Sequence, residues 1–171
     1  MPVLSTDIQF LLSGGAANTS PAASLGGIAS TTQVVDAVDN NLFADVTPAQ
    51  ATAGAVHHRG LYAKNVHASL ALTDARLFIS SLTSSADDEL DVAIAVEAVN
   101  VDMATIASET TVPTGVTFTR PTTYGTGLQF NAATGLVASA RRGDWGRRTV
   151  NAGAAAATAV TGTIRVEGTT T

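Results

Sequence analysis

The first candidates for metal chemistry in this sequence are its three histidines. His57 and His58 are adjacent, and His67 follows further along the chain. Adjacent residues of a strand point to opposite faces of a sheet, so His57 and His58 cannot ligate one ion unless the strand bulges. The chain has no Cys and no H-x-x-x-H pair that would complete a ligand set. We therefore expect no metal site and interpret the histidines as surface or interface residues.

A run of carboxylates is the second candidate for cation chemistry. Asp87, Asp88 and Glu89 are consecutive, and Asp91 follows. Calcium binds several oxygens that converge within one loop, but the spacing D-x-[DN]-x-[DN]-G of calcium loops is absent. We expect residues 81–89 to form a polar loop with solvated carboxylates. The alternative is a negative patch that meets arginines of a partner.

The sharpest local feature is a group of arginines around the single Trp. Half of the eight Arg lie within eight residues, where Arg141, Arg142, Arg147 and Arg148 flank Trp145. Arg and Trp are enriched at interface hot spots, and Arg forms bidentate pairs with carboxylates. One interpretation is a contact between subunits. The alternative is a core Trp whose edges are covered by arginine stems. Contact with nucleic acid is the least favoured, because the chain is acidic.

Catalytic signatures are missing from the sequence. Ser, His and Asp are present, but no serine lies in a G-x-S-x-G elbow. The glycines of Gly125-Thr126-Gly127 are expected at a strand turn and not in a dinucleotide loop, since no helix pattern follows them. No pair of carboxylates lies in a context that suggests acid–base catalysis. We therefore predict that the protein is not an enzyme and uses no cofactor.

The composition indicates a structural or binding protein. Of 171 residues, 31 are Ala and 25 are Thr, and only 13% are charged, against roughly 25% in average globular domains. A surface with so little charge is either polar and uncharged or covered by partner molecules. Large apolar side chains are scarce, which predicts a thin core that subunit contacts help to stabilise. We expect a homo-oligomer, either a dimer or a trimer.

Charge and hydropathy narrow the class of partner. The net charge is −5 and the pI about 4.9, which argues against a nucleic-acid-binding protein. No run of about 18 apolar residues is present, so we expect no membrane-spanning segment. The first residues carry neither the basic nor the apolar region of a signal peptide, and without Cys there are no disulfides. Assembly in the bacterial cytoplasm is the expected setting.

Alternation of apolar and polar residues predicts an all-β fold of about eight short strands. The expected strands are residues 7–12, 56–65, 68–72, 91–99, 116–118, 128–130, 144–150 and 161–167, with 76–80 either a further strand or the far side of a bulge. Thr47 and Pro48 predict one capped helical turn. Short strands without βαβ alternation favour an antiparallel β-sandwich of jelly-roll type.

We expect one domain with two parts. Residues 1–52 hold the first strand, an extended arm and an irregular segment, and residues 53–171 form the sandwich body. The arm is the Gly-, Ser- and Pro-rich stretch 13–27, which could reach a neighbouring subunit and order on binding. Its expected contact residues are Ser13, Gly14, Gly15, Asn18 and Leu25. Residues 168–171 are expected to be frayed or held by a neighbour.

Several segments resemble small virion proteins of tailed bacteriophages. They are SGGAAN (13–18) and ASLGG (23–27) near the start, RGLYAKNVHASL (59–70) in the middle, and WGRRTVNAG (145–153) and IRVEG (164–168) near the end. Together they cover about a third of the chain. In these phages such proteins are mostly structural, and the segments carry no catalytic signature.

The resemblance implies a virion component. The role that best fits the composition is a capsid decoration (cement) protein on the capsid surface, which binds the major capsid protein and copies of itself and stabilises the assembled lattice by linkage. The same fold could serve as a head–tail neck or tail component. A host-binding or glycan-binding β-sandwich module is the second alternative.

Overall fold

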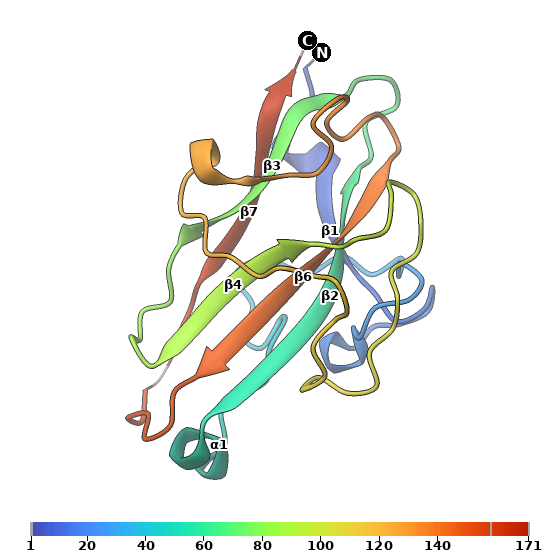
Figure 1. Cartoon of the computed structure of the whole chain (residues 1–171). Coiled ribbons are helices and arrows are strands. Elements are labelled where there is room, and N and C mark those ends of the chain that lie inside the picture. Colours follow the sequence, from blue (N-terminus) through green and yellow to red (C-terminus); the bar gives the residue numbers. More distant parts are fainter. Residues whose placement is uncertain (1, 158, 171) are drawn as a thin grey trace.

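The protein consists of two antiparallel β-sheets that pack on each other (Figure 1). The computed structural model describes residues 2–157 and 159–170. The larger sheet has the order β1-β2-β6-β4 and the smaller sheet the order β5-β3-β7. The strands are β1 (Ile8–Leu12), β2 (Ala55–Asn65), β3 (Leu72–Ser81), β4 (Asp88–Ile94), β5 (Leu128–Gln129), β6 (Arg141–Val150) and β7 (Thr163–Thr170). The predicted all-β class is confirmed.

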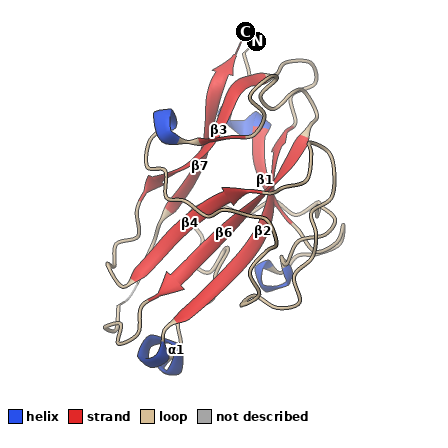
Figure 2. Ribbon diagram, in the orientation of Figure 1, coloured by secondary structure: helices blue, strands red, loops and turns tan. Residues whose placement is uncertain are grey.

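Helical structure is confined to short pieces at the ends of strands and in loops (Figure 2). The helix α1 (Pro48–Ala53) precedes β2. The side chain of Thr47 accepts a hydrogen bond from the Gln50 N–H at 3.2 Å, and the Gln50 side chain accepts one from the Thr47 N–H at 2.9 Å. This reciprocal capping box, with proline in the first turn, confirms the predicted capped turn.

The main core lies between the two sheets. Apolar residues at alternate positions point inward, among them Ala63 on β2 and Val92 on β4 from the larger sheet. Leu77 and Ile79 on β3 face them from the smaller sheet, and Phe130 follows β5. Alternation along a strand places every second side chain on one face, which is why these spacings were readable from the sequence.

The strand predicted at 68–72 is wrong, and the bulge alternative for 76–80 is confirmed. β3 is one strand with an irregular register between Thr73 and Arg76. Before it, the Asn65 side chain donates to the Leu70 carbonyl at 2.9 Å, and His67 Nδ1 accepts hydrogen bonds from the backbone of the same turn. Side chains that hydrogen-bond to nearby backbone compete with strand pairing, and here they hold residues 66–71 outside the sheet.

The strand predicted at 91–99 is shifted. β4 begins at Asp88 and ends at Ile94, so the expected polar loop 81–89 ends two residues earlier, at residue 87. Two carboxylates of the acidic run are not solvated, because Asp88 and Asp91 are only 6% and 5% exposed and pair with arginines of β6. The pairing of β4 with β6 begins at the Asp88–Val150 register position, and this long-range contact sets the boundary.

Three further expectations are corrected. Residues 116–118 form no strand, and only Thr119 bridges to Val92 in that segment. Residues 168–170 are not frayed, because they belong to β7 and pair with β3; Thr171 lies outside the described residues. β6 begins at Arg141, earlier than predicted.

The stretch 13–27 is not an extended arm. It folds back on β2, where the Ser13 hydroxyl donates to the Gly60 carbonyl at 2.7 Å and accepts from the Gly26 N–H at 3.0 Å. The Gly60 N–H donates in turn to the Ser24 carbonyl at 2.8 Å. Ser13 and Ser24 are fully buried, since the missing side chain of Gly60 lets the loop backbone approach the strand.

Candidate functional site

The outer face of the larger sheet is covered by two long loops, residues 13–34 and 95–120. Tyr62 on β2 holds both, because its hydroxyl donates to the Gly27 carbonyl at 2.6 Å and accepts from the Met103 N–H at 2.7 Å. The loops also pair directly, through Gly27 N–H to the Met103 carbonyl at 2.9 Å. Burial raises the pKa of the Tyr62 phenol, so it stays a neutral hydrogen-bonding group.

Trp145 lies at the centre of this covered face. It projects from β6 opposite Gly60 of β2, and it is 2% exposed. Gly143, two residues earlier on the same face, leaves room for Met103, since a Cβ there would lie 2.3 Å from the Met103 Cγ. The sheet therefore has a second apolar cluster on its outer face, built around Trp145, Tyr62 and Met103.

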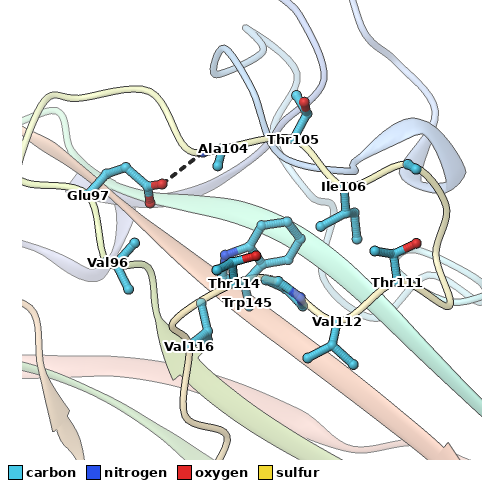
Figure 3. Close-up of a pocket in the computed structure, with 12 residues that line it drawn as sticks. Val96, Glu97, Ala104, Thr105, Ile106, Thr111, Val112, Thr114, Val116 and Trp145 are labelled. Atoms are coloured by element: carbon cyan, nitrogen blue, oxygen red, sulfur yellow. Dashed lines mark hydrogen bonds between the residues drawn. The ribbon is translucent and has the colours of Figure 1, made fainter.

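A small groove opens to solvent above Trp145, and we call it the Trp145 groove. It encloses about 120 Å³. Figure 3 shows the indole at its floor, with Val96 and Val116 on one side and Ile106 and Val112 on the other. Val96 and Val112 are 58% and 62% exposed. The groove thus combines a fixed aromatic floor with an apolar rim that faces solvent.

One wall of the Trp145 groove is fixed by a carboxylate. The Glu97 side chain accepts a hydrogen bond from the Ala104 N–H at 2.9 Å (Figure 3). Further along the loop, Glu109 accepts through its carbonyl from the His58 N–H at 2.7 Å and forms an ion pair with Arg59. These contacts anchor the loop at both ends of the groove.

The arginines of β6 are used within the chain. Arg147 Nη2 lies 2.8 Å from Asp91 Oδ2, and Arg120 Nε lies 2.9 Å from Asp91 Oδ1. Arg148 binds Asp88 through two nitrogens and donates to the Ala44 carbonyl at 2.7 Å. The acidic run therefore meets arginines of its own chain, where the sequence left open arginines of a partner.

Most of the remaining predicted contact residues are also packed against the chain itself. Arg141 Nη2 lies 2.5 Å from Asp102 Oδ1, and Arg142 Nη2 donates to the Ala95 carbonyl at 3.1 Å. Asn18 donates to the Ser13 carbonyl at 2.6 Å. Leu25 and Gly15 are half-buried, and Gly14 is exposed. Trp145 is a buried core residue, as the second interpretation has it. Its cover is Tyr62, Met103 and Ala93 and not arginine stems, since Arg141 and Arg147 lie over the rings of Tyr62 and Phe118.

Asp91→Asn is expected to lower the free energy of unfolding by about 2 kcal/mol. The substitution leaves Arg147 and Arg120 without their shared counter-charge, and their partial exposure to water limits the cost. Urea denaturation at pH 7 measures the effect. The matched control is Asp102→Asn, which removes a more exposed partner from Arg141 and should cost at most about 0.5 kcal/mol. Equal losses for the two variants would contradict the buried network.

The histidines do not form a site. β2 is regular across His57 and His58, so they occupy opposite faces as predicted. The surface assignment is wrong for this pair, because His57 is 9% exposed and His58 fully buried. Burial lowers the pKa of His58, and its ring packs 5.3 Å from that of Phe118. In the part of the chain that the structure describes, no three His, Asp or Glu side chains are placed to hold a metal ion.

A second groove lies between the edge strands β1 and β7 of the two sheets and encloses about 330 Å³. Ile8 and Phe10 line it from β1, and Ile164 and Val166 line it from β7. Sequence reasoning missed this groove. The alternation in both strands marks inward-facing residues, but only the sheet order shows that the two strands are neighbouring edges.

Comparison with known proteins identifies no relative: no family model, curated protein or solved structure matches the chain. Within residues 2–157 and 159–170, no helix is long and apolar enough to cross a bilayer. The arrangement of side chains is therefore what the functional argument rests on. It offers two apolar grooves with fixed walls, and its charged side chains are mostly paired with one another.

Proposed function

We propose that the protein is a structural component of a tailed-phage virion, a decoration protein that binds the major capsid lattice and itself. The observation that carries this proposal is the exposed apolar rim of the Trp145 groove. Val96 and Val112 expose more than half of their surface over a rigid floor, which is the anatomy of a docking site for an apolar side chain of a partner.

The charge distribution supports attachment by apolar and backbone contacts. Arg59, Arg120, Arg147 and Arg148 all pair with carboxylates of this chain, so few arginines remain to be neutralised by a partner. Burial at sites that exist only in an assembled lattice stabilises that lattice by mass action. We further propose that the two sheets form a jelly-roll-like β-sandwich. Strands that follow one another along the chain mostly lie in different sheets, since β2, β4 and β6 belong to the larger sheet and β3, β5 and β7 to the smaller one.

The position in the virion separates the decoration role from a neck or tail role. A decoration protein has a copy number that scales with the number of capsomers, whereas a neck or tail-tube protein is present in one or a few rings. Quantitative mass spectrometry of purified particles measures this ratio against the major capsid protein. A ratio that corresponds to a few rings would reject the decoration role and favour the neck or tail alternative.

A glycan-binding module is less well supported. Glycan sites usually present exposed aromatic rings, but all eight aromatic side chains of this protein are buried or half-buried. The apolar groups that are largely exposed are aliphatic.

The Trp145 groove is tested by placing a carboxylate on its rim. Val112→Asp is expected to reduce binding to purified heads that lack the protein by at least about tenfold, since an apolar contact is replaced by a charge that must be desolvated. The matched control is Leu82→Asp, at a residue of similar exposure outside the groove. Both variants should unfold at the wild-type urea concentration. Equal binding by Val112→Asp and wild type would reject this surface as the attachment site.

A further inference from the structure

The outer edge of β7 is unpaired. β7 is hydrogen-bonded to β3 on one side, and within the described residues no other strand or backbone segment pairs with it. The other long edges are covered. Val34 N–H donates to the Phe10 carbonyl beside β1, and Thr119 exchanges hydrogen bonds with Val92 beside β4. An uncovered edge is a template for a further strand.

The groups that this edge presents can be assigned. Ile79 donates its N–H to the Pro121 carbonyl, on the side of β3 that faces away from β7. Its register partner Ile164 is therefore in a non-hydrogen-bonded position of the β3–β7 ladder, and so is Val166 two residues on. The N–H and C=O groups of Ile164 and Val166 therefore point away from β3, in the plane of the sheet. By the same alternation, those of Gly168 point the same way.

The side chains between these positions are oppositely charged. Arg165 and Glu167 are two residues apart on the outer face of β7, and Arg165 Nη2 lies 3.3 Å from Glu167 Oε2. Their side chains are 57% and 42% exposed. In an antiparallel pair of two copies centred on Val166, Arg165 of one copy stands opposite Glu167 of the other. These two positions would be non-hydrogen-bonded across the new ladder, where facing side chains come closest. The pattern Arg-Val-Glu is thus complementary to itself.

We propose that β7 pairs with β7 of a second copy of this chain about a two-fold axis at Val166. Val166 exchanges both backbone hydrogen bonds with its own copy, and Ile164 pairs with Gly168 on either side. The two three-stranded sheets become one continuous sheet of six strands. A two-fold axis closes the assembly as a dimer, because each copy uses the same free edge of β7.

The groove between β1 and β7 fits this dimer. Ile164 and Val166 line the groove from β7, and residues opposite each other in an antiparallel pair share a face of the sheet. Val166 of the second copy therefore lies beside Val166 of the first, over the groove that Ile8 and Phe10 also line. Pairing therefore places apolar side chains of the second copy over the open groove between β1 and β7. The dimer does not depend on the proposed role in a virion.

The charge pattern gives a direct test. Sedimentation equilibrium of the full chain should show a dimer, and Arg165→Glu and Glu167→Arg should each weaken it by at least about tenfold, because both symmetric sites then bring like charges together. An equimolar mixture of the two variants should dimerise like the wild type, since glutamates of one face arginines of the other. The double variant Arg165→Glu/Glu167→Arg should also dimerise.

These outcomes distinguish pairing from a folding defect. Both variants should retain the wild-type circular dichroism spectrum and, at protein concentrations low enough for the wild type to be monomeric, the wild-type urea midpoint. A wild-type chain that stays monomeric would overturn the proposal, and so would single variants that dimerise normally. Weakened variants that fail to recover on mixing would overturn it as well, because only self-complementary pairing predicts that recovery.

Discussion

Asp144→Asn is expected to stabilise the protein by up to ~4 kcal/mol at pH 7 and to change its stability little at pH 4. Asp144 is 1% exposed and lies on the inner face of β6, opposite Leu61 of β2 and Ile94 of β4. Its Oδ1 accepts a hydrogen bond from the Ala63 N–H at 3.1 Å, and its Oδ2 has no partner among the described residues. Burial raises the pKa of this carboxyl to about 8.

The direction of the pH dependence follows from proton binding. Below the ordinary Asp pKa of 3.8, the carboxyl of Asp144 is protonated in both the folded and the unfolded chain. Between that value and about 8, the unfolded chain loses the proton while the folded chain keeps it. The folded state then binds more protons, so its stability falls by ~1.4 kcal/mol for each unit that the pH rises. Asparagine has no proton to lose, and its stability lacks this slope.

Urea denaturation of both proteins between pH 4 and pH 8 measures the difference. The gain in unfolding free energy from Asp144→Asn should grow steadily with pH and level off near pH 8. Asp102→Asn is the matched control, because Asp102 is exposed and its substitution should give a nearly constant difference. A constant difference for Asp144→Asn as well would contradict the raised pKa.

The sequence predicted the parts of the fold that local patterns determine. The alternation in β1 and β2 and the capped turn at Thr47 and Pro48 are each complete within a few neighbouring residues, and the structure has all three. Boundaries set by distant partners were missed. β4 begins at Asp88 because Arg148 of β6 binds that carboxylate, and nothing between residues 81 and 89 contains this information.

The candidate site could not be predicted from local patterns either, because distant residues form it. The composition of residues 13–27 indicates a loop, but its packing depends on Gly60 of β2. The alternation along β6 places Trp145 on one face of the strand. This pattern does not tell whether that face is exposed or covered. The loop 95–120 buries it, through the hydrogen bond that the Met103 N–H donates to the Tyr62 hydroxyl and through the packing of the Met103 side chain. A signal was present in the two glycines, Gly60 and Gly143, which face that loop.

Trp145→Ala is expected to lower the free energy of unfolding by about 3–5 kcal/mol. The indole is buried between the outer face of the sheet and the loop 95–120, in a cluster with Tyr62, Met103 and Ala93. Alanine leaves a large cavity there, and the loop can collapse only in part because Tyr62 and Glu109 fix it to β2. Circular dichroism during urea denaturation measures the loss, since the chain has no other Trp for fluorescence.

Two further variants separate loss of packing from loss of the groove surface. Trp145→Phe keeps an aromatic floor and should lose less than half as much stability as Trp145→Ala. Val112→Ala shortens the exposed rim and should stay within about 0.5 kcal/mol of the wild type. If Trp145→Ala were as stable as the wild type, the ring would contribute no packing free energy. The loops would then have to be held over the sheet by their hydrogen bonds and ion pair to β2, without a contribution from the indole.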